Sequence, residues 1–261
     1  MDIGKKPTNI VNSLVKGLHV IKSFSGCSEG LTISEVARRC GLDAAGARRI
    51  LLTLESLGYA SQERRRFRLT PRVLEVGYSY LSSMPSWSFG QSLLEHLAGR
   101  TNETCSASVL DGTEIVYVLR AQIRRILFSG GSVGTRIPAY VTSMGRIWLA
   151  NRSEEQLDEY FAKAQLQAFT KATITDERKL RAEIQRIKKQ GWAYVDGELE
   201  EGVSGISVPV YNPSGHIVLA INISASSRRI SRHVMKTDLL EELIKTKAEF
   251  QDQLAIGHQV R

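Results

Sequence analysis

A helix-start signal and a helix-stop signal lie nine residues apart near the N-terminus, and this spacing restricts the fold more than any other feature of the sequence. Thr32 followed by Glu35 forms a capping box, in which the hydroxyl and the carboxylate satisfy free amides of a first helical turn. Gly41 can adopt the left-handed conformation that ends a helix. The sequence therefore predicts a helix over residues 33–40 and, after a tight turn, another over residues 44–57, which together make a helix-turn-helix.

The segments on both sides complete a winged version of this motif. Apolar residues at steps of three and four predict a preceding amphipathic helix over residues 11–24. Two short runs after the helix-turn-helix, residues 59–60 and 67–69, predict a β-hairpin whose tip is residues 63–66. We therefore expect residues 8–70 to form a winged helix-turn-helix domain.

The predicted second helix of the motif combines small residues with arginines on its exposed face, and the hairpin tip adds more arginines. Small side chains in the first turn let a helix enter the major groove of DNA, where arginines can reach guanine edges. Arginines at a hairpin tip suit phosphate or minor-groove contact. The alternative is a solvated helix face that happens to carry two arginines. The candidate DNA contacts are Ala44, Ala45, Arg48, Arg49, Thr53, Arg64, Arg65 and Arg66.

Positive charge is concentrated in the first third of the chain. Residues 1–85 hold 13 lysines and arginines against 7 aspartates and glutamates, whereas the other 176 residues hold 22 against 20. A short basic module is the electrostatic footprint expected of a partner with phosphate charge, although solvated basic faces are common. Double-stranded operator DNA is therefore the expected partner of this module.

The rest of the composition indicates a cytoplasmic protein. The sequence contains no stretch apolar enough to cross a bilayer, and its N-terminus does not have the pattern of a signal peptide. Cys27, Cys40 and Cys105 are odd in number and widely spaced, which suits reduced thiols better than a disulfide framework or a zinc site.

A linker helix and a second domain are expected after the hairpin. Pro71 suits the first position of a helix, and residues 71–84 are the expected linker. Residues 85–257 alternate strands and helices irregularly, which favours an α+β domain with an antiparallel sheet. The expected strands cover residues 104–110, 115–120, 125–129, 192–196, 205–211 and 217–225, and the expected helices cover residues 87–100, 143–150, 175–190 and 237–254.

The start of the helix over residues 143–150 is a candidate ligand site. Free backbone amides at a helix N-terminus, aided by the helix dipole and the Ser143 hydroxyl, can hold a carboxylate. Asn222 and Ser224 are two residues apart in a predicted strand, so both point to one face of an apolar run, where polar groups need partners. They could instead bond to neighbouring backbone or to water.

Two other classes of protein compete with a ligand-responsive regulator. An enzyme is the main alternative, but the five histidines fall on unrelated elements and none adjoins a pattern that would make a nucleophile or a metal site. We therefore expect no catalysis and no cofactor. The acidic run over residues 196–201 could suggest a metal, yet such runs are usually solvated loops. The second alternative is an interaction protein that binds no ligand.

Six segments resemble, in order and in spacing, the IclR family of bacterial transcriptional regulators. The resemblance implies a winged helix-turn-helix, a linker helix and a GAF-like effector domain, in a homodimer or a dimer of dimers. Two stretches, LTPRVLEVGYSYLSS and PAYVTSMGR, are similar to the branch that controls the β-ketoadipate pathway of aromatic-acid breakdown. The six segments are SLVKGLHVIKSF, LTISEVARRCGL, ARRILLTLESLGY, FRLTPRVLEVGYSYL, GTRIPAYVTSMGRIWLA and GWAYVDGELEEGVSGISVPVYNPSGHIVLAINIS.

The resemblance also implies an effector pocket and its ligand. We expect a small carboxylate such as protocatechuate, 4-hydroxybenzoate or β-ketoadipate; a regulator of another carboxylic-acid pathway is the alternative. Its carboxylate would lie at the amides around Ser143, with help from Arg136 unless that arginine forms a structural salt bridge. RNA polymerase is a further candidate partner. The candidate effector-binding residues are Arg136, Ser143, Met144, Gly145, Trp148, Gly205, Asn222 and Ser224.

Overall fold

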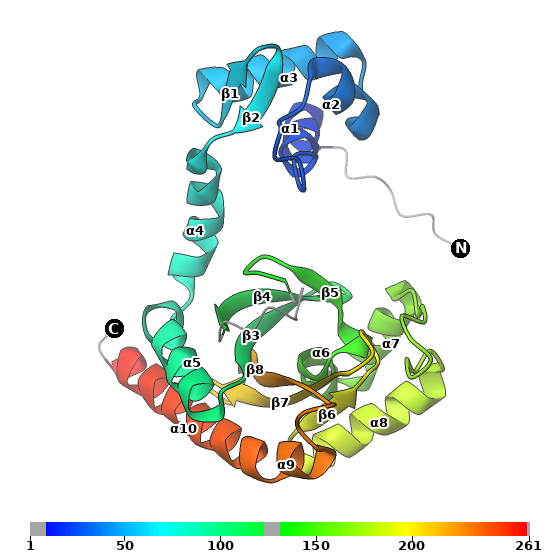
Figure 1. The fold of residues 1–261 in the computed structure, drawn as a ribbon, viewed down its shortest axis with the longest axis vertical. Coiled ribbons are helices and arrows are strands. Elements are labelled where there is room, and N and C mark those ends of the chain that lie inside the picture. The colour runs from blue at the N-terminus through cyan, green and yellow to red at the C-terminus, as the bar shows by residue number, and fades with distance from the viewer. Residues whose placement is uncertain (1–8, 123–130, 260–261) are drawn as a thin grey trace. The chain divides into compact units, whose positions relative to one another are not determined.

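The computed structural model describes residues 9–122 and 131–259, so the strand predicted over residues 125–129 lies outside the described residues. The chain divides into two compact units between Tyr80 and Leu81 (Figure 1). No helix within the described ranges is long and apolar enough to span a membrane.

The N-terminal unit is a winged helix-turn-helix, as the sequence predicts. Thr32 Oγ1 accepts from the Glu35 amide at 3.3 Å, and Glu35 Oε2 accepts from the Thr32 amide at 2.7 Å, so both halves of the capping box form. Gly41 ends the second helix with φ of 63°, and Asp43 Oδ1 caps the third by accepting from the Gly46 amide at 2.6 Å. The elements are α1 (Asn12–Lys22), α2 (Ile33–Cys40), α3 (Ala44–Ser56) and the antiparallel strands β1 (Ala60–Glu63) and β2 (Arg66–Leu69).

A small core fixes the wing against the three helices. Val20, Leu51 and Phe67 are fully buried. The main chains of Leu31 and Phe67 exchange two hydrogen bonds of 2.8 Å, which tie the start of α2 to the wing strand β2. The position of the hairpin relative to α3 is therefore set by packing and by main-chain pairing within this unit.

A short 3-10 helix, η1 (Pro71–Val73), leads into α4 (Leu74–Ser83). Thr70 caps η1, because its Oγ1 accepts from the Arg72 amide at 3.3 Å, and Pro71 occupies the first turn, where a missing amide proton costs nothing.

The C-terminal unit is built on an antiparallel sheet in the strand order β5-β4-β3-β8-β7-β6. The α+β fold predicted from the sequence is thus confirmed. The short strand β5 and the helices α7 and α9 were not predicted, whereas the helix expected over residues 237–254 corresponds to α10. The strands are β3 (Thr104–Asp111), β4 (Glu114–Ala121), β5 (Arg136–Pro138), β6 (Ala193–Asp196), β7 (Val203–Tyr211) and β8 (Ile217–Ser226). The helices are α5 (Trp87–Thr101), η2 (Ala139–Val141), α6 (Ser143–Ala150), α7 (Glu154–Lys163), α8 (Glu177–Gln190), α9 (Arg232–Lys236) and α10 (Asp238–Gln259).

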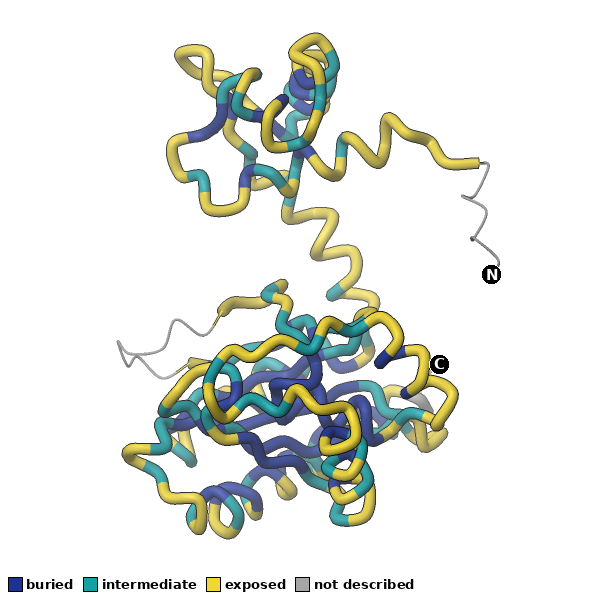
Figure 2. Tube along the Cα trace, turned by 90° about the vertical axis from the view of Figure 1, so that its right-hand side faces the viewer, coloured by how far each residue is buried: buried dark blue, intermediate teal, exposed yellow. Residues whose placement is uncertain are grey.

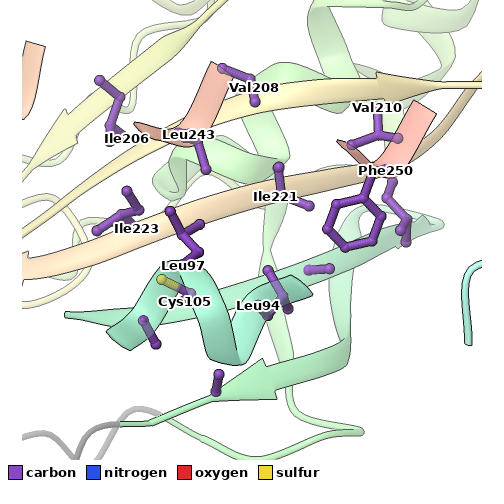
Figure 3. Close-up of a cluster of buried hydrophobic side chains, with 14 of the residues drawn as sticks. Leu94, Leu97, Cys105, Ile206, Val208, Val210, Ile221, Ile223, Leu243 and Phe250 are labelled. Atoms are coloured by element: carbon purple, nitrogen blue, oxygen red, sulfur yellow. The ribbon is translucent and has the colours of Figure 1, made fainter. Parts of the chain in front are cut away.

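The sheet separates two hydrophobic cores, and the interior of this unit is mostly buried (Figure 2). On one face, Leu97 of α5 and Leu243 and Phe250 of α10 pack against alternate residues of β7 and β8 (Figure 3). On the other face, α6 and α8 pack against Ile115 and Ala193. The second face also carries the polar residues that form the site.

The cysteines form no disulfide: Cys27 and Cys40 are half-buried and Cys105 is buried. Burial raises the pKa of the Cys105 thiol to about 12, so this side chain is a neutral member of the core.

Candidate functional site

The third helix, α3, carries the predicted DNA contacts on its exposed side. Ala47 and Leu51 point into the core, whereas the predicted contact residues are all exposed. The ion pairs found among the described residues include neither Arg48 nor Arg49. The exposed contact residues are Ala44, Ala45, Arg48, Arg49 and Thr53. This face therefore offers two guanidinium groups behind a first turn of small side chains.

The three arginines of the wing differ in the contacts that their side chains make. Arg64 and Arg65 form the two-residue turn between β1 and β2, with φ of 46° and 67°, and both are exposed. A turn with two positive φ angles matches the twist of a hairpin, although it strains residues other than glycine and asparagine. Arg66 instead donates to the Gly30 carbonyl at 3.0 Å and lies 3.3 Å from Glu35 Oε2. Of the three arginines, Arg64 and Arg65 have no such contact with the residues that the structure describes.

A cavity of about 270 Å³ lies in the C-terminal unit between the sheet and the N-terminus of α6. Apolar side chains, among them Ile137, Val141 and Leu199, form part of its wall. Five of the eight predicted effector residues also line it: Ser143, Met144, Gly205, Asn222 and Ser224. The structure thus brings together residues that are up to 81 positions apart in the sequence.

The α6 end of the cavity is closely hydrogen-bonded. Ser207 Oγ donates to Ser143 Oγ at 2.7 Å, and Thr142 caps α6 by accepting from the Gly145 amide at 2.9 Å. A Cβ atom at Gly205 would lie 3.0 Å from Ser143 Oγ, so the glycine leaves the room that Ser143 occupies. Part of the hydrogen-bonding capacity expected to hold a carboxylate here is therefore already used within the protein.

Asn222 is the polar group of the cavity that most clearly needs a partner. Its side chain is 96% buried, and Nδ2 donates to Ser224 Oγ at 2.7 Å. Its Oδ1 has no hydrogen-bond donor among the residues that the structure describes. A buried acceptor without a partner costs roughly 1–3 kcal/mol, so a bound hydroxyl that donates to Oδ1 would recover this cost.

Arg136 lies outside the cavity, in β5, where it is bound by two carboxylates. Its Nη1 is 2.7 Å from Asp111 Oδ2, and its Nε is 2.7 Å from Glu114 Oε2. Hydrogen bonds to Glu114 and Asp111 raise the pKa of Arg136 above its ordinary value. We considered a structural salt bridge and a contact with the effector carboxylate for this residue. The structure contains the salt bridge and does not place the guanidinium at the carboxylate site.

Gly145 and Trp148 also do not line the cavity. A Cβ at Gly145 would lie 2.0 Å from the Ala139 carbonyl oxygen, so the glycine permits close packing of η2 on α6. Trp148 is buried in the core beyond the cavity, and its Nε1 donates to the Ser108 carbonyl at 3.2 Å. Their contacts are therefore structural, and Met144 is the predicted apolar wall residue that reaches the cavity.

The cavity residues that sequence patterns missed include Tyr117 and Arg120 in β4. Burial raises the pKa of Tyr117, and the positive charge of Arg120 opposes this shift. Glu198, from the acidic run that could have suggested a metal, also lines the cavity but is buried and paired with Arg146 at 2.6 Å. The continuous apolar run over residues 115–119 of β4 gave no indication that Arg120, which follows it, would face a cavity.

A basic helix face and wing in one unit and a polar-walled cavity in the other define a DNA-binding regulator that responds to a small molecule. Residues 13–64 match the IclR helix-turn-helix domain, and residues 78–250 match the family described as bacterial transcriptional regulator IclR C-terminal. The chain belongs to the IclR family, and the resemblance noted from the sequence is confirmed.

Similar proteins carry related names. The Pca regulon regulatory protein of Pseudomonas putida is 38% identical over 94% of this chain and 85% of its own length. The structure of a transcriptional regulator from a Rhodococcus species matches with a TM-score of 0.86 and 42% identity, over 95% of this chain and 99% of that one. A double mutant of the PobR inducer-binding domain from Acinetobacter, in complex with 3-hydroxybenzoic acid, matches with a TM-score of 0.61 and 31% identity, over 64% of this chain and 97% of that one.

Proposed function

We propose that this IclR-type regulator controls genes of aromatic-acid breakdown and that its effector is a small aromatic hydroxy acid bound in the cavity between the sheet and α6. The observation that carries the proposal is Asn222 Oδ1 at the cavity wall, a buried acceptor to which no described residue donates. A phenolic hydroxyl supplies such a donor, and a benzene ring suits apolar neighbours such as Met144 and Val141.

The names of similar proteins support the same class of effector. The relative from Pseudomonas putida is named for the Pca regulon, and the inducer-binding domain from Acinetobacter was solved with a hydroxybenzoic acid. Both relatives exceed 30% identity to this chain. Protocatechuate and 4-hydroxybenzoate are therefore our first candidates, and β-ketoadipate, an acid without a ring, is the third.

We infer that α3 and the wing bind DNA. We propose that the exposed face of α3 reads base edges in the major groove and that Arg64 and Arg65 contact phosphates or the minor groove. A homodimer or a dimer of dimers would place two such faces on one operator in the cytoplasm, and the effector would alter operator occupancy and so the access of RNA polymerase.

Calorimetry on the full chain tests the effector. We expect 4-hydroxybenzoate or protocatechuate to bind and to raise the unfolding temperature, since a ligand at 100 times its Kd stabilises the native state by about 2.7 kcal/mol. The Asn222→Ala variant should lose roughly 10-fold in affinity for the hydroxylated acid and little for benzoate, which has no hydroxyl to donate. Binding of neither aromatic acid by the wild-type protein would contradict the proposal.

A further inference from the structure

Regular pairing between β3 and β4 is interrupted at Val118. Ala107 pairs with Leu119 but Ser108 pairs with Tyr117, so Val118 has no partner on β3 and β4 contains a β-bulge. In a regular strand, residues three positions apart face opposite sides of the sheet. The extra residue reverses this alternation for the end of β4.

The bulge brings Tyr117 and Arg120 to the same face of the sheet. The guanidinium carbon of Arg120 lies 5.2 Å from the centre of the Tyr117 ring, and both residues line the cavity. Val118 and Leu119 belong to the core on the opposite face. Without the bulge, Leu119 would follow Tyr117 on the cavity face, and Arg120 would point toward α5 and α10.

Arg120 begins a row of polar residues that crosses the sheet. It pairs with Ser106, Ser106 pairs with Asn222, and Asn222 pairs with Ser207, which bonds to Ser143. Ser106, Asn222 and Ser207 are each at least 96% buried. Ser106 and Ser207 have hydrogen-bond partners in the protein, whereas Asn222 Oδ1 has none among the described residues, so a bound donor would complete the row.

The charge of Arg120 has no counter-ion among the described residues. Its neighbours are neutral: Nη1 donates to Ser106 Oγ at 3.4 Å, and the Gln122 amide, oriented with its oxygen toward the guanidinium, accepts from Nε and Nη2 at 3.1 and 3.0 Å. Two carboxylates line the same cavity. Glu198 is engaged by Arg146, and the exposed Glu200 makes no ion pair with Arg120.

We propose that Arg120 binds the carboxylate of the effector and that the bulge at Val118 is the feature that positions it there. A guanidinium can hold a carboxylate through two parallel hydrogen bonds, which gives both affinity and orientation. The effector then lies along the polar row, with its hydroxyl at Asn222, two strands and so about 10 Å from the Arg120 backbone. This assignment rests on the proposed function and moves the carboxylate from the α6 N-terminus to β4.

The experiment compares acids with their uncharged amides. Calorimetry would measure the binding of 4-hydroxybenzoate, protocatechuate and the two corresponding carboxamides to the wild-type chain and to Arg120→Gln, Arg120→Lys and Arg136→Gln. We expect Arg120→Gln to weaken acid binding roughly 10- to 100-fold and to leave amide binding nearly unchanged. Arg120→Lys should recover part of the preference for the acid, because lysine restores the charge without the planar fork. Arg136→Gln, a matched change outside the cavity, should behave as wild type.

The outcomes separate this inference from the proposed function. If Arg120→Gln still prefers the acid to the amide as strongly as wild type does, the carboxylate is held elsewhere and the inference is wrong. If Arg136→Gln loses the preference for the acid, Arg136 in β5 binds the carboxylate, and the inference about Arg120 is wrong. If the wild-type chain binds neither acid, the proposed function itself is contradicted. Unfolding temperatures without ligand show whether each variant is folded.

Discussion

Arg146 of α6 and Glu198 of the connection between β6 and β7 form a buried ion pair, with Nη2 and Oε2 2.6 Å apart and side chains only 2% and 7% exposed. Glu198 Oε2 also accepts from the Ile174 amide at 3.0 Å, and Arg146 Nε donates to the Tyr140 carbonyl at 2.9 Å. Arg146 lies one turn after Ser143. The pair therefore holds two walls of the cavity together.

Removing one partner of this pair should destabilise the C-terminal unit. Arg146→Met would leave the Glu198 carboxylate buried without a counter-ion, and such changes cost about 3–5 kcal/mol. The double variant Arg146→Met/Glu198→Leu should recover much of that loss, because it removes the stranded charge as well. Urea unfolding followed by circular dichroism measures both. A loss below about 1 kcal/mol in the single variant would show that the pair has no structural importance.

The stability of the N-terminal unit should depend on pH through Glu35. Hydrogen bonds from Thr32 to its carboxylate hold the pKa of Glu35 below the ordinary value of 4.5. This contribution is fully present above that value and is lost as the pH falls through the lowered pKa of the folded state. Glu35→Gln keeps a capping side chain but removes the titration.

Thermal unfolding of both proteins between about pH 3 and 7 measures this effect. Wild type should exceed Glu35→Gln in stability by a constant amount near neutral pH, and the difference should shrink in acid. A difference that does not change with pH would show that the charge of Glu35 is unimportant for the cap.

The elements of the N-terminal unit could be predicted from the sequence because their determinants are local. Each cap acts within one helical turn. The structure contains the capping box of Thr32 and Glu35 at the start of α2, the left-handed Gly41 at its end, and the Asp43 cap at the start of α3. The missed helix α7 also begins with a capping box, formed by Ser153 and Gln156, which could have revealed it.

The cavity could be predicted only in part because it depends on long-range pairing. Ser143, Gly205 and Asn222 were found through family resemblance and strand alternation. Arg120 was missed because the bulge at Val118 reverses that alternation, and a bulge is set by the pairing with β3 rather than by the residues of β4 alone.

Arg48 and Arg49 should determine operator affinity. Each is exposed on α3 and has no ion-pair partner within the described chain, so each can make base-edge contacts. Replacing either with alanine should cost about 1–3 kcal/mol of operator binding and relax specificity at one base pair. Electrophoretic mobility shifts with variant operators measure this, with Arg178→Ala, an exposed change on α8, as the control. Wild-type affinity in both α3 variants would refute the assignment of α3 as the recognition helix.

The wing arginines should differ from those of α3 and from one another. Arg64→Ala and Arg65→Ala should weaken binding to all DNA sequences and reduce the slope of log affinity against log salt by about one each. Arg66→Ala should change the slope less, because that side chain is bound to the Gly30 carbonyl and near Glu35. Equal slopes for the three variants would contradict this distinction.

Gly205→Ala should impair the effector response while preserving the fold and DNA binding. The added methyl would lie 3.0 Å from Ser143 Oγ and 3.7 Å from Asn222 Nδ2, so it would displace Ser143 from Ser207 or narrow the cavity at the hydroxyl end. One methyl group in a fitted pocket changes affinity by about 1–3 kcal/mol, or roughly 10- to 200-fold. Gly99→Ala in α5 is the matched control, since a Cβ there has no atom within 4 Å. Calorimetry with 4-hydroxybenzoate and protocatechuate should show the loss only in Gly205→Ala, and undiminished binding by that variant would mean that the effector does not depend on this wall of the cavity.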